Sequence, residues 1–126
     1  MTDKVVDASA LAAAAFLEKE AAVIGARLAG HKLFAPFLLD FEISNICRKK
    51  MRDHPADRSI IFAQFVASRS VPVELRDIDF PEVVELATLR NITAYDASYL
   101  WLARRLGAEL VTLDKRLEKA AKATLS

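Results

Sequence analysis

The sequence is poor in residues that cross-link or interrupt a chain. Its 126 residues include one cysteine, Cys47, together with three glycines and four prolines. A single cysteine excludes an internal disulfide and is typical of a reducing compartment. No stretch has the composition of a flexible linker, an internal repeat or a low-complexity tract. We therefore expect a single domain over residues 1–126, a length that suffices for a hydrophobic core.

Long hydrophobic runs and a strong net charge are also missing. The apolar stretch 8–17 is too short to span a bilayer, and the acids on both sides of it are unlike the flanks of a signal peptide. The formal net charge is +1, so any polyanionic partner would need a local basic patch. Because 53% of the residues are hydrophobic and 28% are charged, the composition indicates a globular protein. We predict a cytoplasmic protein with no membrane partner.

The sequence does contain short apolar runs that alternate with helix-like segments. We expect strands at residues 4–6, 33–35, 71–75 and 109–113, and helices at residues 10–28, 40–52, 57–68, 80–89, 93–107 and 115–123. Ser9 is the expected cap of the first helix, and Pro72 makes the third strand a candidate for a sheet edge. This alternation predicts an α/β fold, a three-layer α/β/α sandwich around a mainly parallel four-stranded sheet.

The segment 93–107 is apolar nearly all round, so we expect a largely buried helix. Thr93 is a favourable N-cap, and Gly107 is a favourable stop. Asp96 is the only charged residue between Arg90 and Arg104, and we expect it to be the acid in the most apolar surroundings. The aromatic residues of this helix could stack nucleobases, but on an apolar helix we assign them to the core: Tyr95, Tyr99 and Trp101.

Four acids are expected at one edge of this sheet. Asp7 and Asp114 directly follow the first and fourth strands, at their carboxyl ends. Glu42 and Asp96 lie near the starts of helices whose N-termini face the same edge. Each acid alone could be a helix cap or a surface charge, but four convergent carboxylates repel one another. The usual remedy is a hard divalent cation bound through oxygen, and Mg²⁺ suits a site with few direct carboxylates and several waters.

The segments that carry these acids are 5–11, 41–45, 93–99 and 110–114. In this order they resemble the PIN-domain family, most closely the VapC-type toxins of bacterial toxin–antitoxin pairs. The resemblance implies an endoribonuclease that depends on Mg²⁺ or Mn²⁺ and hydrolyses RNA phosphodiesters with a metal-activated water. It also implies the roles of individual residues. The metal-binding and catalytic acids would be Asp7, Glu42, Asp96 and Asp114, and the supporting residues would be Asn45, Thr112 and Ser9.

The resemblance implies partners as well: an RNA substrate, a cognate antitoxin protein and a second copy in a homodimer. We expect Lys49 to contact RNA phosphates, because it lies two helical turns from Glu42 on the same side. The sequence departs from the family in one respect. Family members commonly end in a fifth strand, and we expect this strand to be missing or vestigial here. Its absence would affect the sheet edge and the dimer surface rather than the acids.

Two other functions fit parts of the pattern. A phosphatase or phosphoacceptor could use a similar parallel sheet, but a phosphatase of the haloacid-dehalogenase type would need a second Asp where Ser9 stands. A non-catalytic PIN-like binding module would leave the four acids inert. Metal-dependent cleavage of RNA by the purified, partner-free protein would separate the three possibilities.

Overall fold

The computed structural model of the chain describes residues 2–125, and four parallel strands form its centre. These strands are β1 (Asp3–Val6), β2 (Lys32–Pro36), β3 (Val73–Arg76) and β4 (Glu109–Val111), in the order β3-β2-β1-β4. The chain enters at the middle of the sheet, and β1 lies between β2 and β4. The predicted parallel sheet is therefore confirmed, and the strands that precede Asp7 and Asp114 are neighbours.

The pattern of burial explains which strands lie inside the sheet. Val5 and Val6 of β1 are fully buried, as their β-branched side chains favour. Strand β3 is an edge strand, and its residues alternate between partly buried and exposed. It starts two residues later than expected, directly after Pro72, which has no N–H to donate to a ladder.

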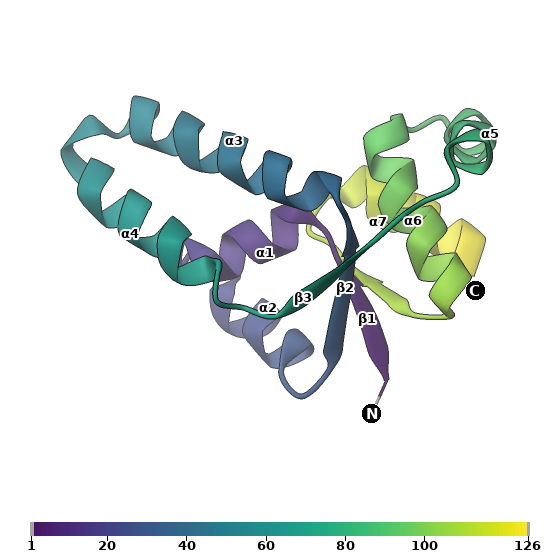
Figure 1. Cartoon of the computed structure of the whole chain (residues 1–126), viewed down its shortest axis with the longest axis horizontal. Helices are drawn as coiled ribbons and strands as arrows, with labels where there is room; N and C mark the ends of the chain where they lie inside the picture. The colour runs from purple at the N-terminus through teal and green to yellow at the C-terminus, as the bar shows by residue number, and fades with distance from the viewer. Residues whose placement is uncertain (1, 126) are drawn as a thin grey trace.

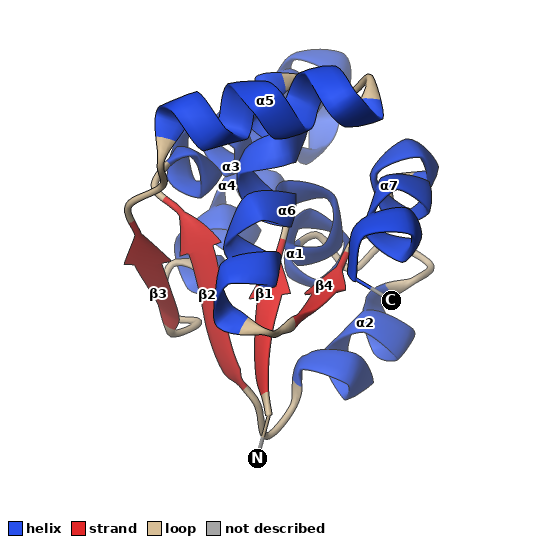
Figure 2. Ribbon diagram, turned by 90° about the vertical axis from the view of Figure 1, so that its right-hand side faces the viewer, coloured by secondary structure: helices blue, strands red, loops and turns tan. Residues whose placement is uncertain are grey.

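Seven α-helices and one short 3-10 helix connect and cover the strands within the described residues. They are α1 (Ala8–Ala15), α2 (Ala21–Leu28), α3 (Leu38–Asp53), η1 (Pro55–Asp57), α4 (Arg58–Ser68), α5 (Phe80–Arg90), α6 (Ala94–Leu106) and α7 (Lys115–Leu125). Helices α1, α3 and α4 lie on one face of the sheet, and α6 and α7 lie on the other (Figures 1 and 2). This arrangement confirms the three-layer sandwich. Helices α3 and α4 pack together as a hairpin that extends away from the sheet (Figure 1).

The single helix expected over residues 10–28 is wrong, because the chain breaks after α1. The N–H of Glu18 donates to the carbonyl oxygen of Ala13 at 3.0 Å, and Leu17 adopts a left-handed φ of 53°. This is the closing pattern of a helix C-terminus, here with leucine at the position where glycine is usual. Ser9 was also the wrong cap, since the carboxylate of Asp7 accepts the N–H of Ala10.

Helix α6 has the predicted ends and crosses the sheet as its most buried helix. The Thr93 hydroxyl accepts the N–H of Asp96 at 3.0 Å, and Gly107 adopts a left-handed φ of 61°. Tyr99 and Trp101 are buried as predicted, but Tyr95 is 67% exposed. The assignment of Tyr95 to the core is wrong because the first turn of α6 projects beyond the carboxyl edge of the sheet (Figure 2).

Two further expectations concern strands and membranes. Within residues 2–125 the sheet has four strands, so the part of the chain that the structure describes contains no fifth strand. In the same range no helix is both long and apolar enough to cross a membrane.

Candidate metal centre

Asp7 is held at the point where β1 turns into α1. Its backbone N–H donates to the carbonyl oxygen of Val111 at 3.2 Å, which ties the end of β1 to β4. Asp7 is 5% exposed, and its carboxylate accepts three hydrogen bonds. Oδ1 accepts the N–H of Ala10 at 3.0 Å and the Ser9 hydroxyl at 2.8 Å, and Oδ2 accepts the Thr112 hydroxyl at 2.7 Å. The carboxylate is therefore fixed by neutral donors.

The predicted supporting residues Ser9 and Thr112 join the two loops of the site. The Ser9 hydroxyl accepts the N–H of Leu113 at 3.0 Å, and the Thr112 hydroxyl accepts the N–H of Asp114 at 3.0 Å. The two hydroxyls lie 3.3 Å apart. Through them, the turn that carries Asp7 and the loop that carries Asp114 form one hydrogen-bonded unit.

Asp96, at the start of α6, and Asp114, between β4 and α7, line the same hollow. Asp114 caps α7, since its Oδ1 accepts the N–H of Leu117 at 3.0 Å, and its side chain is exposed. Asp96 lies half-buried in the first turn of α6. Asp7 and Asp114 therefore do act as helix caps. A capping bond uses only part of a carboxylate's four lone-pair positions, so each of these acids can also bind a cation.

Glu42 lies in the second turn of α3 and is held from across the crevice by α6. The Tyr99 hydroxyl donates to Oε1 of Glu42 at 2.6 Å. Burial and the charge of Glu42 raise the pKa of Tyr99, so the phenol remains a donor. Sequence reasoning placed Tyr99 only in the core. Its position three residues after Asp96, on the same face of a helix, is the signal that could have added it to the site.

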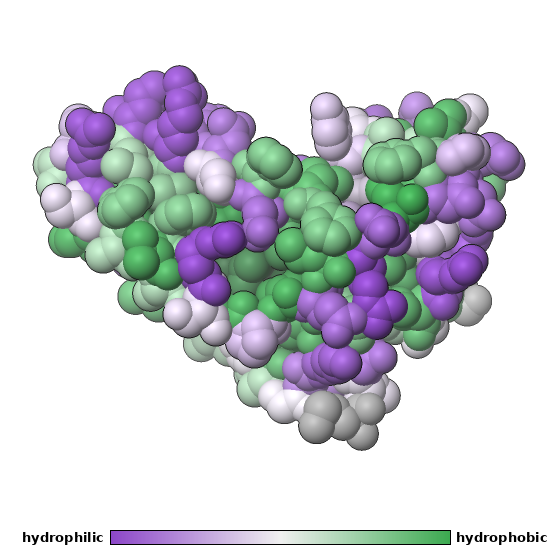
Figure 3. Space-filling view, viewed as in Figure 1, coloured by the Kyte–Doolittle hydropathy of each residue, from purple (hydrophilic) through white to green (hydrophobic). Residues whose placement is uncertain are grey.

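These side chains enclose a hollow of about 280 Å³ at the carboxyl edge of the sheet. Its lining contains all four predicted acids, two predicted supporting residues and the phenol: Asp7, Glu42, Asp96, Asp114, Ser9, Asn45 and Tyr99. Thr112 lies behind Asp7 and contacts the hollow through that carboxylate. The surface is notched between the α3–α4 hairpin and the α5–α6 side of the molecule (Figure 3).

Lys49 does not line this hollow. It lines an adjoining hollow of about 550 Å³, which shares Ser9 and Ile46 with the first. Lys49 is exposed there, whereas its neighbour Lys50 pairs with Glu18 at 3.3 Å. Lys49 thus lies in the hollow that adjoins the one lined by the acids.

The four acids share an unfavourable concentration of negative charge. Burial raises the pKa of Asp7, and the charge of Asp114 adds to that rise while the three hydrogen bonds oppose it. Burial also raises the pKa values of Glu42 and Asp96, with further contributions from neighbouring carboxylates. The expectation that Asp96 has the most apolar surroundings is wrong, because Asp7 is more deeply buried. The prediction considered only the neighbours of Asp96 along α6, whereas Asp7 is enclosed by several elements of the fold.

The donor set fits a hard divalent cation, because it consists of carboxylate, amide and hydroxyl oxygens. Among residues 2–125, no three Asp, Glu, His or Cys side chains are arranged tightly enough to bind one ion together. Mg²⁺ commonly binds through one or two carboxylates and keeps several waters. The arrangement therefore suits an ion that is bound partly through water.

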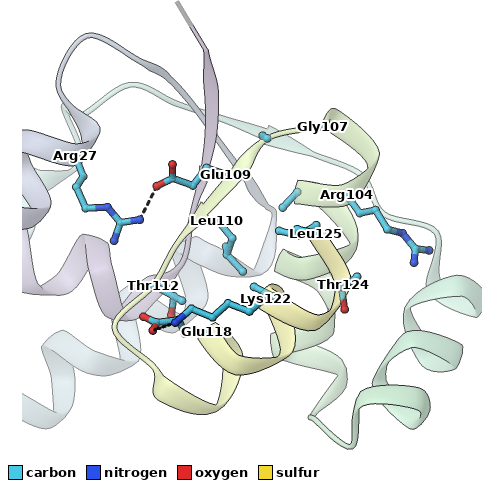
Figure 4. A pocket seen from close by; sticks show the side chains of 13 residues that line it. Arg27, Arg104, Gly107, Glu109, Leu110, Thr112, Glu118, Lys122, Thr124 and Leu125 are labelled. Atoms are coloured by element: carbon cyan, nitrogen blue, oxygen red, sulfur yellow. Dashed lines mark hydrogen bonds and ion pairs between the residues drawn. The ribbon is translucent and has the colours of Figure 1, made fainter.

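A larger hollow, of about 680 Å³, lies between β4 and α7 (Figure 4). Its acids face cations: Glu109 pairs with Arg27, and Glu118 pairs with Lys122 at 3.3 Å. Because these charges are already balanced, this hollow lacks the chemical feature that would attract a metal ion.

Comparison with known proteins agrees with the geometry. A model of the PIN domain matches residues 4–123, so the chain belongs to the PIN-domain family. It is similar to VapC ribonuclease Mb0985 of Mycobacterium bovis and to ribonuclease VapC9 of Mycobacterium tuberculosis. Each is 36% identical over 124 residues, which cover 94% of this chain and 91% of the relative. The crystal structure of PAE2754 from Pyrobaculum aerophilum superposes with a TM-score of 0.77 at 31% identity, covering 96% of this chain and 86% of that one. The resemblance to VapC-type proteins is confirmed.

Proposed function

We propose that this protein is a metal-dependent endoribonuclease and the toxin of a toxin–antitoxin pair. The observation that carries the proposal is the convergence of four carboxylates in a hollow whose lining, among residues 2–125, contains no lysine or arginine. The relatives named as ribonucleases support it. The PIN-domain membership favours a nuclease over a phosphatase on a similar sheet.

Asp7, Glu42, Asp96 and Asp114 would hold Mg²⁺ or Mn²⁺, partly through bound water. Such an ion, when bound, supplies a water of lowered pKa and neutralises charge that develops on the phosphoryl oxygens. The chain contributes the orientation of its carboxylates before the substrate arrives. Ser9 and Thr112 fix Asp7, and Tyr99 fixes Glu42. A preorganised set of charges avoids the cost of reorganisation during the reaction.

The substrate in this proposal is RNA, which would run from the acid hollow into the adjoining one. Lys49 is exposed in the adjoining hollow and would contact phosphates. Lys50 is a weaker candidate, since it pairs with Glu18 and lies over the ring of Phe16. A local basic contact of this kind suits a protein whose net charge is only +1.

The partner in this proposal is an antitoxin segment that docks on apolar surface beside the acids. A hollow of about 450 Å³ between α5 and α6 is lined by Phe80, Val84 and Tyr95, all of them well exposed. Apolar side chains of a helical segment fit such a groove, and a basic residue beyond them would reach the acids. We further propose a homodimer, as the family resemblance implies, that acts in the cytoplasm, as the single cysteine favours.

The test of the proposed function is cleavage of RNA by protein that has been freed of antitoxin and of other nucleases. We expect cleavage with Mg²⁺ or Mn²⁺ and none with excess EDTA. Asp7→Asn and Asp114→Asn should both be inactive. Cleavage in EDTA, or undiminished cleavage by either variant, would contradict the proposal. A folded protein that binds Mg²⁺ yet cuts no RNA would instead be the non-catalytic binding module.

A further inference from the structure

The hydrogen bond between Tyr99 and Glu42 carries an inference beyond the four acids. Tyr99 is 1% exposed, and its ring is packed in the core of the sandwich. Its hydroxyl is the part that emerges into the acid hollow, where it donates to Oε1 of Glu42 at 2.6 Å. The two residues are 57 positions apart in sequence, on helices from opposite faces of the sheet.

The packing of the ring does not require this hydroxyl. Phenylalanine would fill the same space and would need no hydrogen-bond partner, whereas a buried phenol must find one. Within residues 2–125, the partner that Tyr99 finds is the carboxylate of Glu42. The hydroxyl therefore matters through what it does to Glu42.

The bond leaves the two oxygens of Glu42 unequal. Oε1 is engaged by the phenol, while Oε2 receives no hydrogen bond and no ion pair from the described residues 2–125. The phenol takes one lone pair of Oε1, so Oε2 is the oxygen of Glu42 that is more open to a cation. Mg²⁺ requires near-octahedral geometry built from single oxygens and retained waters, whereas Ca²⁺ readily accepts both oxygens of one carboxylate. The number of oxygens that Glu42 offers thus bears on which ion the site prefers.

We propose that Tyr99 is a positioning residue that holds Glu42 as a one-oxygen ligand and thereby favours Mg²⁺ over Ca²⁺ at this site. The inference rests on the proposed metal site. It adds a specific reason why a tyrosine, and not a phenylalanine, stands at this place in α6.

The first experiment measures ion binding by isothermal titration calorimetry on metal-free protein, with Mg²⁺ and with Ca²⁺. Tyr99→Phe removes the hydroxyl. Tyr95→Phe is the matched control for ion binding, because Tyr95 lies on the same helix, is exposed and lines the apolar hollow between α5 and α6 rather than the acid hollow. We expect Tyr95→Phe to bind as the wild type does. Tyr99→Phe should bind Mg²⁺ about 10- to 100-fold more weakly, the usual cost of losing an outer partner of a metal ligand. Its Ca²⁺ affinity should change less, so the preference for Mg²⁺ should fall.

Two results would overturn the inference and are distinguishable. If the wild type binds Mg²⁺ and Tyr99→Phe keeps the same affinities for both ions, the metal site stands but the role of Tyr99 is wrong. If the wild type binds no Mg²⁺, the proposed metal site fails, and the role of Tyr99 fails with it.

A double-mutant cycle tests whether Tyr99 acts through Glu42. In the Glu42→Gln background, the further change Tyr99→Phe should leave Mg²⁺ affinity unchanged, because the carboxylate that it positions is already gone. An equal loss in both backgrounds would mean that Tyr99 acts on the site by another route, contrary to the inference.

A spectroscopic measurement avoids any loss of folding in Tyr99→Phe. The chain has two tyrosines, so in Tyr95→Phe the only tyrosine is Tyr99. With tyrosine labelled with ¹³C at Cζ, this variant gives a single phenol resonance. We expect Mg²⁺ to shift that resonance saturably, with the dissociation constant found by calorimetry. A resonance that stays in place while calorimetry shows Mg²⁺ binding would overturn the inference.

Discussion

The hollow at the carboxyl edge and the larger hollow between β4 and α7 both contain acids, but the acids have different neighbours. In the larger one, Glu109 and Glu118 each face a lysine or an arginine (Figure 4). In the smaller one, none of the four acids forms an ion pair with another residue between 2 and 125, and the pKa of Asp7 is raised, burial being the main cause. Unbalanced charge, and not volume, therefore distinguishes the proposed metal site from the larger hollow.

The largest change should be the loss of RNA cleavage when an acid of the smaller hollow is neutralised. Asp7→Asn should lower the rate of RNA cleavage by roughly 10³-fold or more, because a bound metal ion supplies several kcal/mol of transition-state stabilisation. Asparagine can still cap α1, so the fold should survive. Glu118→Gln is the matched control, since it removes only one partner of an exposed ion pair. Equal activity of the two variants would contradict the assignment of the metal site to the smaller hollow.

Metal binding should stabilise the protein through the smaller hollow alone. In wild type, Mg²⁺ at about 100 times its dissociation constant should add about 2.7 kcal/mol to the free energy of unfolding. Thermal melting with EDTA and with Mg²⁺ measures this as a rise in Tm. Glu118→Gln should show the same rise, and Asp114→Asn should show much less. A rise that is equal in Asp114→Asn would place the ion elsewhere.

Without metal, neutralising one acid should stabilise the fold. Asp96 is half-buried, and the charges of Asp114 and Asp7 add to the effect of burial in raising its pKa. Asp96→Asn removes that repulsion, on the order of 1 kcal/mol after screening by water, and Thr93 still caps α6. Melting in EDTA at neutral pH should show a Tm higher by roughly 3–5 °C. A lower Tm would mean that Asp96 acts mainly as a structural acid of the first turn.

The same charges predict a pH dependence of stability. The folded-state pKa values of Asp7, Asp96 and Glu42 are raised above the ordinary values of 3.8 for Asp and 4.5 for Glu. Their protonated forms therefore favour the folded state, and this contribution is lost as pH rises through the raised values. In EDTA, wild type should lose more stability than Asp96→Asn between pH 4.5 and neutral pH, as roughly estimated from these ordinary values. Parallel pH profiles of the two proteins would contradict the coupling of the acids.

The smallest expected effect concerns the basic residue beside the acids. Lys49→Ala should weaken RNA binding a few-fold and should reduce the salt dependence of binding by about one unit of slope, the effect of one lost phosphate contact. Lys122→Ala removes a lysine from the larger hollow and serves as the control. Binding titrations at several salt concentrations measure both. If the two variants behave alike, RNA does not follow the path past Lys49.

The sequence was sufficient to predict the sheet and the place of the acids, because both follow from local rules. An acid directly after a parallel strand lies at the carboxyl edge, and this held for Asp7 and Asp114. The break after α1 was missed because leucine, not glycine, takes the left-handed position at Leu17. The bond from Tyr99 to Glu42 joins residues 57 positions apart, which no local pattern encodes. Tyr95 was misplaced because its exposure depends on where α6 begins relative to the sheet.

The central claim is that Asp7, Glu42, Asp96 and Asp114 form one divalent-metal site. The most direct test is electron paramagnetic resonance of Mn²⁺, whose free-ion signal decreases when the ion binds to protein. We predict that wild type and Glu118→Gln bind Mn²⁺ with equal affinity, that Mg²⁺ displaces it, and that Asp7→Asn and Asp114→Asn bind it much more weakly. Undiminished Mn²⁺ binding by Asp7→Asn and Asp114→Asn, or no binding by wild type, would contradict the claim.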